Sequence, residues 1–79
     1  MHKSAYPVGG EPLGLTFDGA NIWVANWSDN TVTKLRAKDG TGIRTLMVDQ
    51  SPTDAAFDGS SIWVTSYGSN TVDKISRVR

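Results

Sequence analysis

Side chains that commonly perform catalysis are scarce in this sequence of 79 residues. It contains no cysteine, a single histidine (His2) and a single glutamate (Glu11). Without cysteine, the chain has no thiolate nucleophile, disulfide or zinc–thiolate site. A serine nucleophile would in turn lack a suitably placed histidine base. We therefore predict that the protein is not an enzyme, has no catalytic residue and needs no cofactor.

Two Asp-Gly pairs, Asp18-Gly19 and Asp58-Gly59, are the obvious candidates for holding a cation. A calcium loop needs further oxygen ligands at alternate positions, a glycine and a distal glutamate. Neither pair is followed by such residues. Asp-Gly is also typical of tight hairpin turns, because the glycine readily adopts positive φ values. We interpret both pairs as turns and predict no metal site.

The best candidates for binding lie in two polar segments, residues 26–30 and 66–70. Each segment contains a large aromatic residue, Trp27 or Tyr67. Such rings offer a flat apolar face and a hydrogen-bond donor, which suits stacking on a sugar or on a partner's side chain. The alternative is that the rings cover a gap between neighbouring sheets. The predicted binding residues are Trp27, Tyr67, Asn26, Ser66 and Asp29.

These segments belong to a sequence repeat with a period of 40 residues. Phe-Asp-Gly, Ile-Trp-Val and Asn-Thr-Val-x-Lys each occur twice, so that Trp23 matches Trp63 and Lys34 matches Lys74. We interpret both lysines, together with Arg36, as solvated charges. Asn30 and Asn70 are interpreted as turn residues in the left-handed region, which asparagine tolerates.

Each repeat consists of short β-branched and aromatic runs separated by turn residues, which is the pattern of antiparallel strands. Four strands in about 40 residues is the size of a β-propeller blade. We therefore predict an all-β chain of two four-stranded antiparallel blades. The predicted strands are 13–17, 21–26, 31–36 and 43–48 in the first repeat, and 53–57, 61–66 and 71–78 in the second.

The second strand of each repeat, with Ile22-Trp23-Val24 or Ile62-Trp63-Val64, is apolar on both faces. Such a strand must be covered on both faces. Two stacked sheets alone would leave two large apolar faces in water, more than a soluble monomer usually exposes. Because no disulfide or metal is available to stabilise so small a chain, we predict self-association.

The phase of the repeat adds a prediction about how copies join. Tyr6 and Val8 precede Leu46 and Val48 by 40 residues. Residues 1–8 are therefore predicted to form the outer strand of a neighbouring chain's blade, where Pro7 is tolerated at a sheet edge. Residues 9–48 would form the first blade, and residues 49–79 the first three strands of the second. The alternative is a frayed terminus.

Two blades per chain would give a dimer of four blades, a trimer of six or a tetramer of eight, because propellers usually have four to eight. Leu13 and Leu15 are bulky for the narrow centre of a four-bladed ring. We therefore favour a homotrimer of six blades, followed by a homotetramer of eight.

The segments Trp23-Val24-Ala25-Asn26 and Trp63-Val64-Thr65-Ser66, with Phe-Asp-Gly before and Asn-Thr-Val-x-Lys after them, resemble the YVTN-type propeller repeat. They are similar too to blades of streptogramin lyase-like and NHL-type proteins. The resemblance implies the blade but no single activity, because those proteins include lyases, lactonases and protein-binding scaffolds. The lyases are understood to use a histidine and a glutamate beside a divalent metal. Neither His2 nor Glu11 matches that motif.

Three functions remain open at this stage. The first is a non-enzymatic scaffold or binding module with a glycan or protein ligand. The second is a fragment of a lyase- or lactonase-like enzyme, and the third is a designed or excised propeller with no ligand. A net charge of zero argues against nucleic acid and membrane surfaces as partners. The first residues also lack an apolar signal segment, so a cytoplasmic location is the default expectation.

Overall fold

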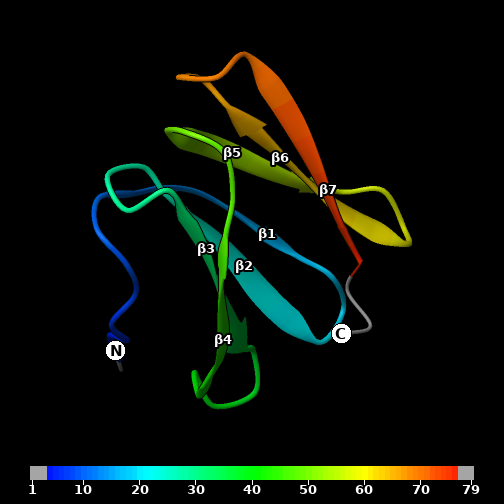
Figure 1. Ribbon diagram of the computed structural model, residues 1–79. Helices are drawn as coiled ribbons and strands as arrows, with labels where there is room; N and C mark the ends of the chain where they lie inside the picture. Colours follow the sequence, from blue (N-terminus) through cyan, green and yellow to red (C-terminus); the bar gives the residue numbers. More distant parts are fainter. Residues whose placement is uncertain (1–3, 77–79) are drawn as a thin grey trace.

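The computed structural model describes residues 4–76, which contain seven strands in two antiparallel sheets (Figure 1). Blade 1 consists of β1 (Pro12–Phe17), β2 (Asn21–Asn26), β3 (Thr31–Arg36) and β4 (Gly42–Met47). Blade 2 consists of β5 (Pro52–Phe57), β6 (Ser61–Ser66) and β7 (Thr71–Ser76). Each strand pairs with the next one along the chain. The all-β prediction is confirmed, with strand bounds close to those expected; the predicted end of the last strand lies outside the described residues.

The Asp-Gly pairs form the hairpin turns that the sequence indicates. Asp18 Oδ1 accepts hydrogen bonds from the backbone N–H groups of Ala20 and Asn21, at 2.9 and 2.7 Å. The glycine that follows, Gly19, has a φ of 98°, which a residue with a side chain rarely adopts. Asp58 and Gly59 repeat this arrangement in blade 2.

Asparagine closes the turn that leads into the third strand of each blade. Asn30 and Asn70 have φ values of 58° and 57°, in the left-handed region. Asparagine tolerates this conformation better than most residues. The expectation for both residues is confirmed.

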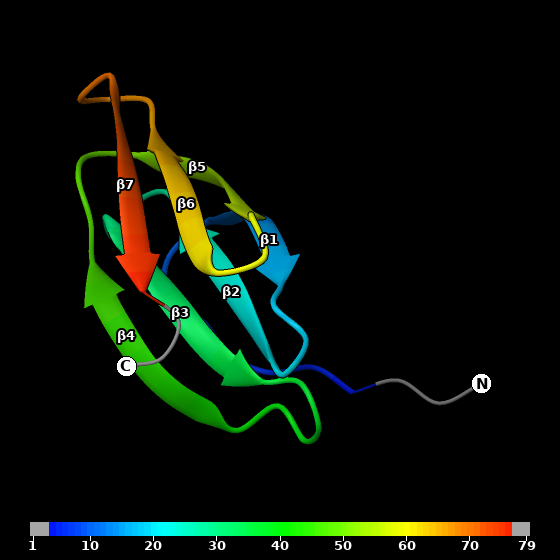
Figure 2. The same cartoon turned by 90° about the vertical axis from the view of Figure 1, so that its right-hand side faces the viewer.

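One face of blade 1 packs on one face of blade 2, and the core lies between them (Figure 2). Trp23 and Val32 of blade 1 contact Ala55, Ile62 and Val64 of blade 2, and all five are buried. Four partly buried residues surround them: Leu46, Val48, Phe57 and Ile75. Each large side chain buried here stabilises the fold by about 1.5–3 kcal/mol relative to an exposed one. The contact between blades is therefore the main source of stability.

The second strands of the two blades differ in burial. On β2, Trp23, Val24 and Ala25 are all buried, so this strand is covered on both faces as predicted. On β6, Ile62 is fully buried but Trp63 is 37% exposed. The prediction of coverage on both faces thus does not hold for β6 within one chain, because no element of the described chain packs on the second face of blade 2.

The two blades approach most closely where β1 runs beside β5. A Cβ atom at Gly14 would lie 2.8 Å from the Asp54 Cα and 2.8 Å from the Thr53 carbonyl oxygen. Both atoms belong to the backbone, so neither could move aside without shifting β5. The absence of a side chain at Gly14 therefore permits this approach.

We expect Gly14→Ala to destabilise the protein by about 1–3 kcal/mol, the usual cost of overpacking. The free energy of unfolding in urea would measure the effect. Gly42→Ala is the matched control, because a Cβ at Gly42 meets no atom within 4 Å. Its effect should stay within about 0.5 kcal/mol. Equal effects of the two substitutions would contradict the close-packing argument.

Candidate functional site

The described residues offer a surface rather than a cavity for binding. Residues 4–76 enclose no pocket, and among them no group of three histidine, aspartate or glutamate residues could hold a metal ion. None of the elements in this part of the chain is a helix able to span a membrane. Any site must therefore be sought among exposed side chains.

The two aromatic turns and the connection from β4 to β5 meet at one end of the sheets (Figure 1). We call this end the turn rim, comprising residues 26–30, 48–51 and 66–70. The Val48 N–H donates to the Asn30 carbonyl oxygen at 3.0 Å, and the Gly68 N–H donates to the Gln50 carbonyl oxygen at 3.1 Å. The connection therefore contacts both turns and holds them beside each other.

Trp27 and Tyr67 are displayed on the turn rim by equivalent backbone contacts. The Trp27 N–H donates to the Glu11 carbonyl oxygen and the Tyr67 N–H to the Ser51 carbonyl oxygen, each at 2.9 Å. The side chains are 38% and 76% exposed, respectively. Tyr67 is thus open to solvent, whereas Trp27 packs partly against its surroundings.

Burial removes two of the predicted binding residues from the surface that a ligand could touch. Asn26 and Ser66 are 0% and 2% exposed. Asn26 Nδ2 donates to the hydroxyl oxygens of Thr31 and Thr33, at 3.2 and 2.8 Å, so its amide cross-links β2 to β3. For these two positions the prediction of direct ligand contact is corrected.

Asp29 remains exposed and has a structural partner. Its Oδ2 accepts a hydrogen bond of 2.7 Å from the Gly10 N–H, which ties the segment preceding β1 to the turn rim. The candidate binding surface therefore narrows to Trp27, Tyr67 and Asp29. Whether it binds a ligand remains a prediction.

One contact that the sequence did not predict joins Asp18, Trp23 and Lys34, which all recur 40 positions later. Asp18 Oδ2 accepts a hydrogen bond of 2.9 Å from Trp23 Nε1, and Lys34 Nζ lies 4.9 Å from the centre of the Trp23 ring. Lys34 is buried at the interface between blades. The prediction of a solvated charge is wrong here, because the ammonium group is held over an indole face by a cation–π contact. The recurrence of all three residues at the same 40-residue spacing is the sequence feature that could have indicated this contact.

Blade 2 contains the same contact in an exposed form. Trp63 Nε1 donates to Asp58 Oδ2 at 2.6 Å, and Lys74 Nζ lies 5.3 Å from the Trp63 ring centre. The hydrogen bond from Trp63, followed by those from the Ser61 and Ser60 N–H groups, lowers the pKa of Asp58 to about 2. The ionised carboxylate is thus part of the folded turn.

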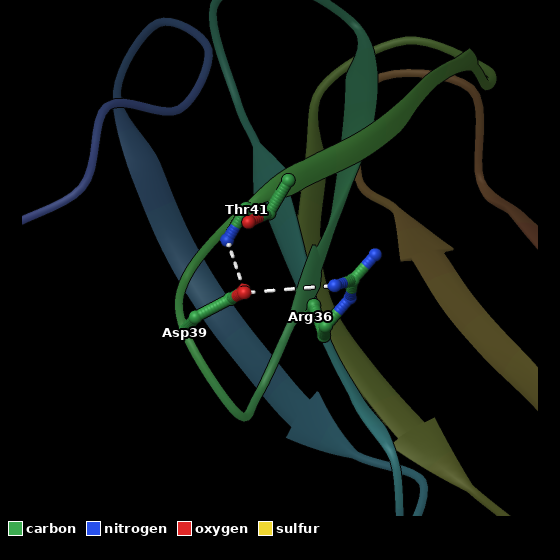
Figure 3. Close-up of polar contacts among 3 residues, drawn as sticks. All are labelled: Arg36, Asp39 and Thr41. Atoms are coloured by element: carbon green, nitrogen blue, oxygen red, sulfur yellow. Dashed lines mark hydrogen bonds and ion pairs between the residues drawn. The ribbon is translucent and has the colours of Figure 1, made fainter.

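A surface ion pair closes the turn between β3 and β4 (Figure 3). Arg36 Nη1 lies 3.5 Å from Asp39 Oδ2, with both side chains about half exposed. Hydrogen bonds from Thr41, including one of 3.0 Å from its N–H, together with the nearby Arg36, lower the pKa of Asp39. Arg36 is therefore solvated as predicted, and such a pair contributes little to stability.

Only one of the two residues considered for catalysis lies in the described part of the chain. Glu11 is exposed in the segment before β1. His2 lies outside the described residues.

Comparison with known proteins supports the fold. No protein-family model matches the sequence, and no curated protein matches it. The structure is similar to part of the Kuenenia stuttgartiensis hydrazine synthase, with a TM-score of 0.82 and 22% identity. The match covers 98% of this chain and 23% of that one, so our chain spans less than a quarter of its length. Because that protein contains a β-propeller, the likeness supports propeller-type blades.

The low pKa of Asp58 predicts a loss of stability in acid. Since the carboxyl's pKa is lower in the folded than in the unfolded chain, its contribution is complete above about pH 4 and is lost as the pH falls towards 2. Asp58→Asn should therefore be less stable than the parent at pH 6, with the difference shrinking between pH 4 and 2. Urea unfolding at a fixed protein concentration measures this. A difference independent of pH would contradict the assignment.

The exposure of the two rim aromatics predicts that they are dispensable for folding. Tyr67→Ala should change the free energy of unfolding by no more than about 0.5 kcal/mol, and Trp27→Ala by somewhat more because that ring is partly buried. Neither substitution should alter the mass measured by light scattering. A lower mass for Tyr67→Ala would show instead that its ring covers a gap between blades.

Proposed function

We propose that the chain is a non-enzymatic propeller module that assembles with copies of itself into a closed ring. The observation that supports this is the complementarity of its two free faces. The contact between blades 1 and 2 uses one face of each blade. Because of the 40-residue repeat, the second face of each blade presents side chains that correspond to those on the covered face of the other blade. A second copy could therefore extend the same stacking.

The free face of blade 2 is the counterpart of the covered face of blade 1. Trp23 and Val32 are buried in the contact between blades, at 1% and 0% exposure. Their counterparts, Trp63 and Val72, are 37% and 56% exposed. The side chains are identical, so the difference in exposure arises from what covers each blade and, for Val72, also from the lack of a strand beside β7 in the described chain.

The free face of blade 1 corresponds in the same way to the covered face of blade 2. Every core residue of blade 2 has an apolar counterpart 40 positions earlier: Leu15, Phe17, Ile22, Val24 and Leu35 stand for Ala55, Phe57, Ile62, Val64 and Ile75. Leu15 and Phe17, on β1, are 62% and 54% exposed, whereas Val24 and Leu35 are already covered within the chain, at 7% and 9%. The β1 side of this face is thus the part suited to receive blade 2 of another copy.

Such a contact is heterologous, because it joins two different faces, and it gives either a closed ring or an open filament. Closure is favoured because it leaves no free face. With two blades per copy, a trimer of six blades is our first choice and a tetramer of eight the second. The ring would present several copies of Trp27 and Tyr67, so weak binding of a glycan or protein would gain from avidity.

One difference between the two repeats bears directly on the contact between copies. Asp54 in β5 corresponds to Gly14 in β1, where a Cβ would strike backbone. A contact between copies must therefore leave more room at Asp54 than the contact within the chain leaves at Gly14. The contact within the chain and the proposed contact between copies thus use similar side chains but differ in the distance between the sheets.

Light scattering after size-exclusion chromatography tests the proposal. We expect the mass of three chains, or of four. Leu15→Glu, which places a charge on the free face of blade 1, should reduce the mass to that of one chain because an unpaired buried charge is costly. Ala37→Glu adds the same charge in an exposed turn and should leave the mass unchanged.

A folded parent protein with the mass of one chain would overturn the proposal. So would a Leu15→Glu variant that retained the full mass while folding normally by circular dichroism.

A further inference from the structure

We propose that residues 4–8 of one copy add to the free edge of β7 in the next copy as the fourth strand of its blade 2. This inference rests on the proposed self-assembly and specifies which edges meet. Within the described residues, β7 pairs only with β6, whereas the equivalent strand β3 also pairs with β4. An unpaired strand edge is a ready template for another strand.

The segment before β1 contacts blade 1 in the same way as the connection from β4 to β5 contacts blade 2. The Ser28 N–H donates to the Gly10 carbonyl oxygen, as the Gly68 N–H does to that of Gln50. The next residues, Glu11 and Ser51, both have positive φ, at 49° and 57°. Gly10 and Glu11 thus make the same backbone contacts as Gln50 and Ser51, and Glu11 shares the left-handed conformation of Ser51. The residues immediately before them correspond to β4, which is an outer strand.

The repeat fixes the register of the proposed pairing. In blade 1, Val32 lies opposite Leu46 and Thr33 lies opposite Thr45. A shift of 40 residues places Val72 opposite Tyr6, and Asp73 opposite Ala5, of the next copy. Val72 and Tyr6 are 56% and 49% exposed in the single chain. The Tyr6 ring lies beside Gly40 of its own blade 1 there, so the proposed pairing requires residues 4–8 to leave that position.

Pro7 fits this register without losing a hydrogen bond. The Val48 N–H donates to the Asn30 carbonyl oxygen. Because hydrogen-bonded and non-bonded pairs alternate along an antiparallel ladder, the N–H of the preceding residue, Met47, points away from β3. Pro7 corresponds to Met47. Its missing N–H would therefore face away from β7.

Asn70 offers acceptors where the incoming segment would need them. Its counterpart Asn30 accepts from the Val48 N–H through its carbonyl oxygen and from the Ser51 N–H through its side-chain Oδ1, at 2.9 Å. Asn70 is exposed and shares the left-handed conformation of Asn30. In the proposed pairing it would accept from the N–H groups of Val8 and Glu11 of the next copy.

Disulfide trapping tests the register, because the parent sequence contains no cysteine. Ala5 and Asp73 would form a non-hydrogen-bonded pair, whose Cα atoms lie about 4.5 Å apart. That spacing is within the range of disulfides, about 4.4–6.8 Å. Oxidised Ala5→Cys/Asp73→Cys protein should give a ladder on a denaturing gel without reductant, with most chains in a top band of three or four.

The matched control is Ala5→Cys/Lys74→Cys, which moves the second cysteine by one residue and so to the opposite face of β7. It should give little cross-linking above the dimer. Each single-cysteine variant can form dimers at most. Light scattering of each reduced variant shows whether the substitutions themselves disturb assembly. If Asp73→Cys disturbs it, Tyr6→Cys/Val72→Cys provides a second in-register pair.

The outcomes separate this inference from the proposed function. An assembled parent whose in-register pairs cross-link no better than the control would overturn the strand pairing and leave self-assembly standing. A monomeric parent would overturn both. A ladder without a limiting band would support the pairing but contradict a closed ring.

Discussion

The structure depends on the packing of one blade face against the next. A four-stranded sheet of about 40 residues has two faces and cannot bury both by itself. Within the chain, Trp23 and Val32 are buried against Ile62 and Val64, and this contact supplies most of the core. Because this contact uses one face of each blade, it leaves the second face of blade 2 and the β1 side of the second face of blade 1 exposed. The proposed assembly follows from that single constraint.

The Asp–Trp–Lys contact links the turns to this packing. Asp18 caps its hairpin turn and accepts a hydrogen bond from Trp23, while Lys34 lies over the indole ring. These two contacts fix the orientation of the tryptophan ring that the next blade covers. The shared spacing of these three residues within the repeat is thus explained by their contacts in the folded blade. Polar residues that recur in a repeat protein can serve the blade itself.

The fold resembles part of a much larger propeller-containing protein, yet the resemblance is limited to architecture. At 22% identity it transfers no activity to this chain. The features of this chain on which the proposals rest are its exposed blade faces and the aromatic turn rim. Assembly would combine them, because a ring that buries the faces repeats the rim around its circumference.

The sequence alone determined the strands, the turns and the repeat, because these depend on local chemistry: Asp-Gly at tight turns, left-handed Asn30 and Asn70, and alternating β-branched residues. Only the tertiary structure decided which recurring side chains are exposed. Burial depends on the neighbouring sheet and not on residue type, so Trp23 and Trp63 share one motif but differ in exposure. For the same reason the sequence could not show that Asn26 is buried beneath the rim or that Lys34 lies inside the contact between blades.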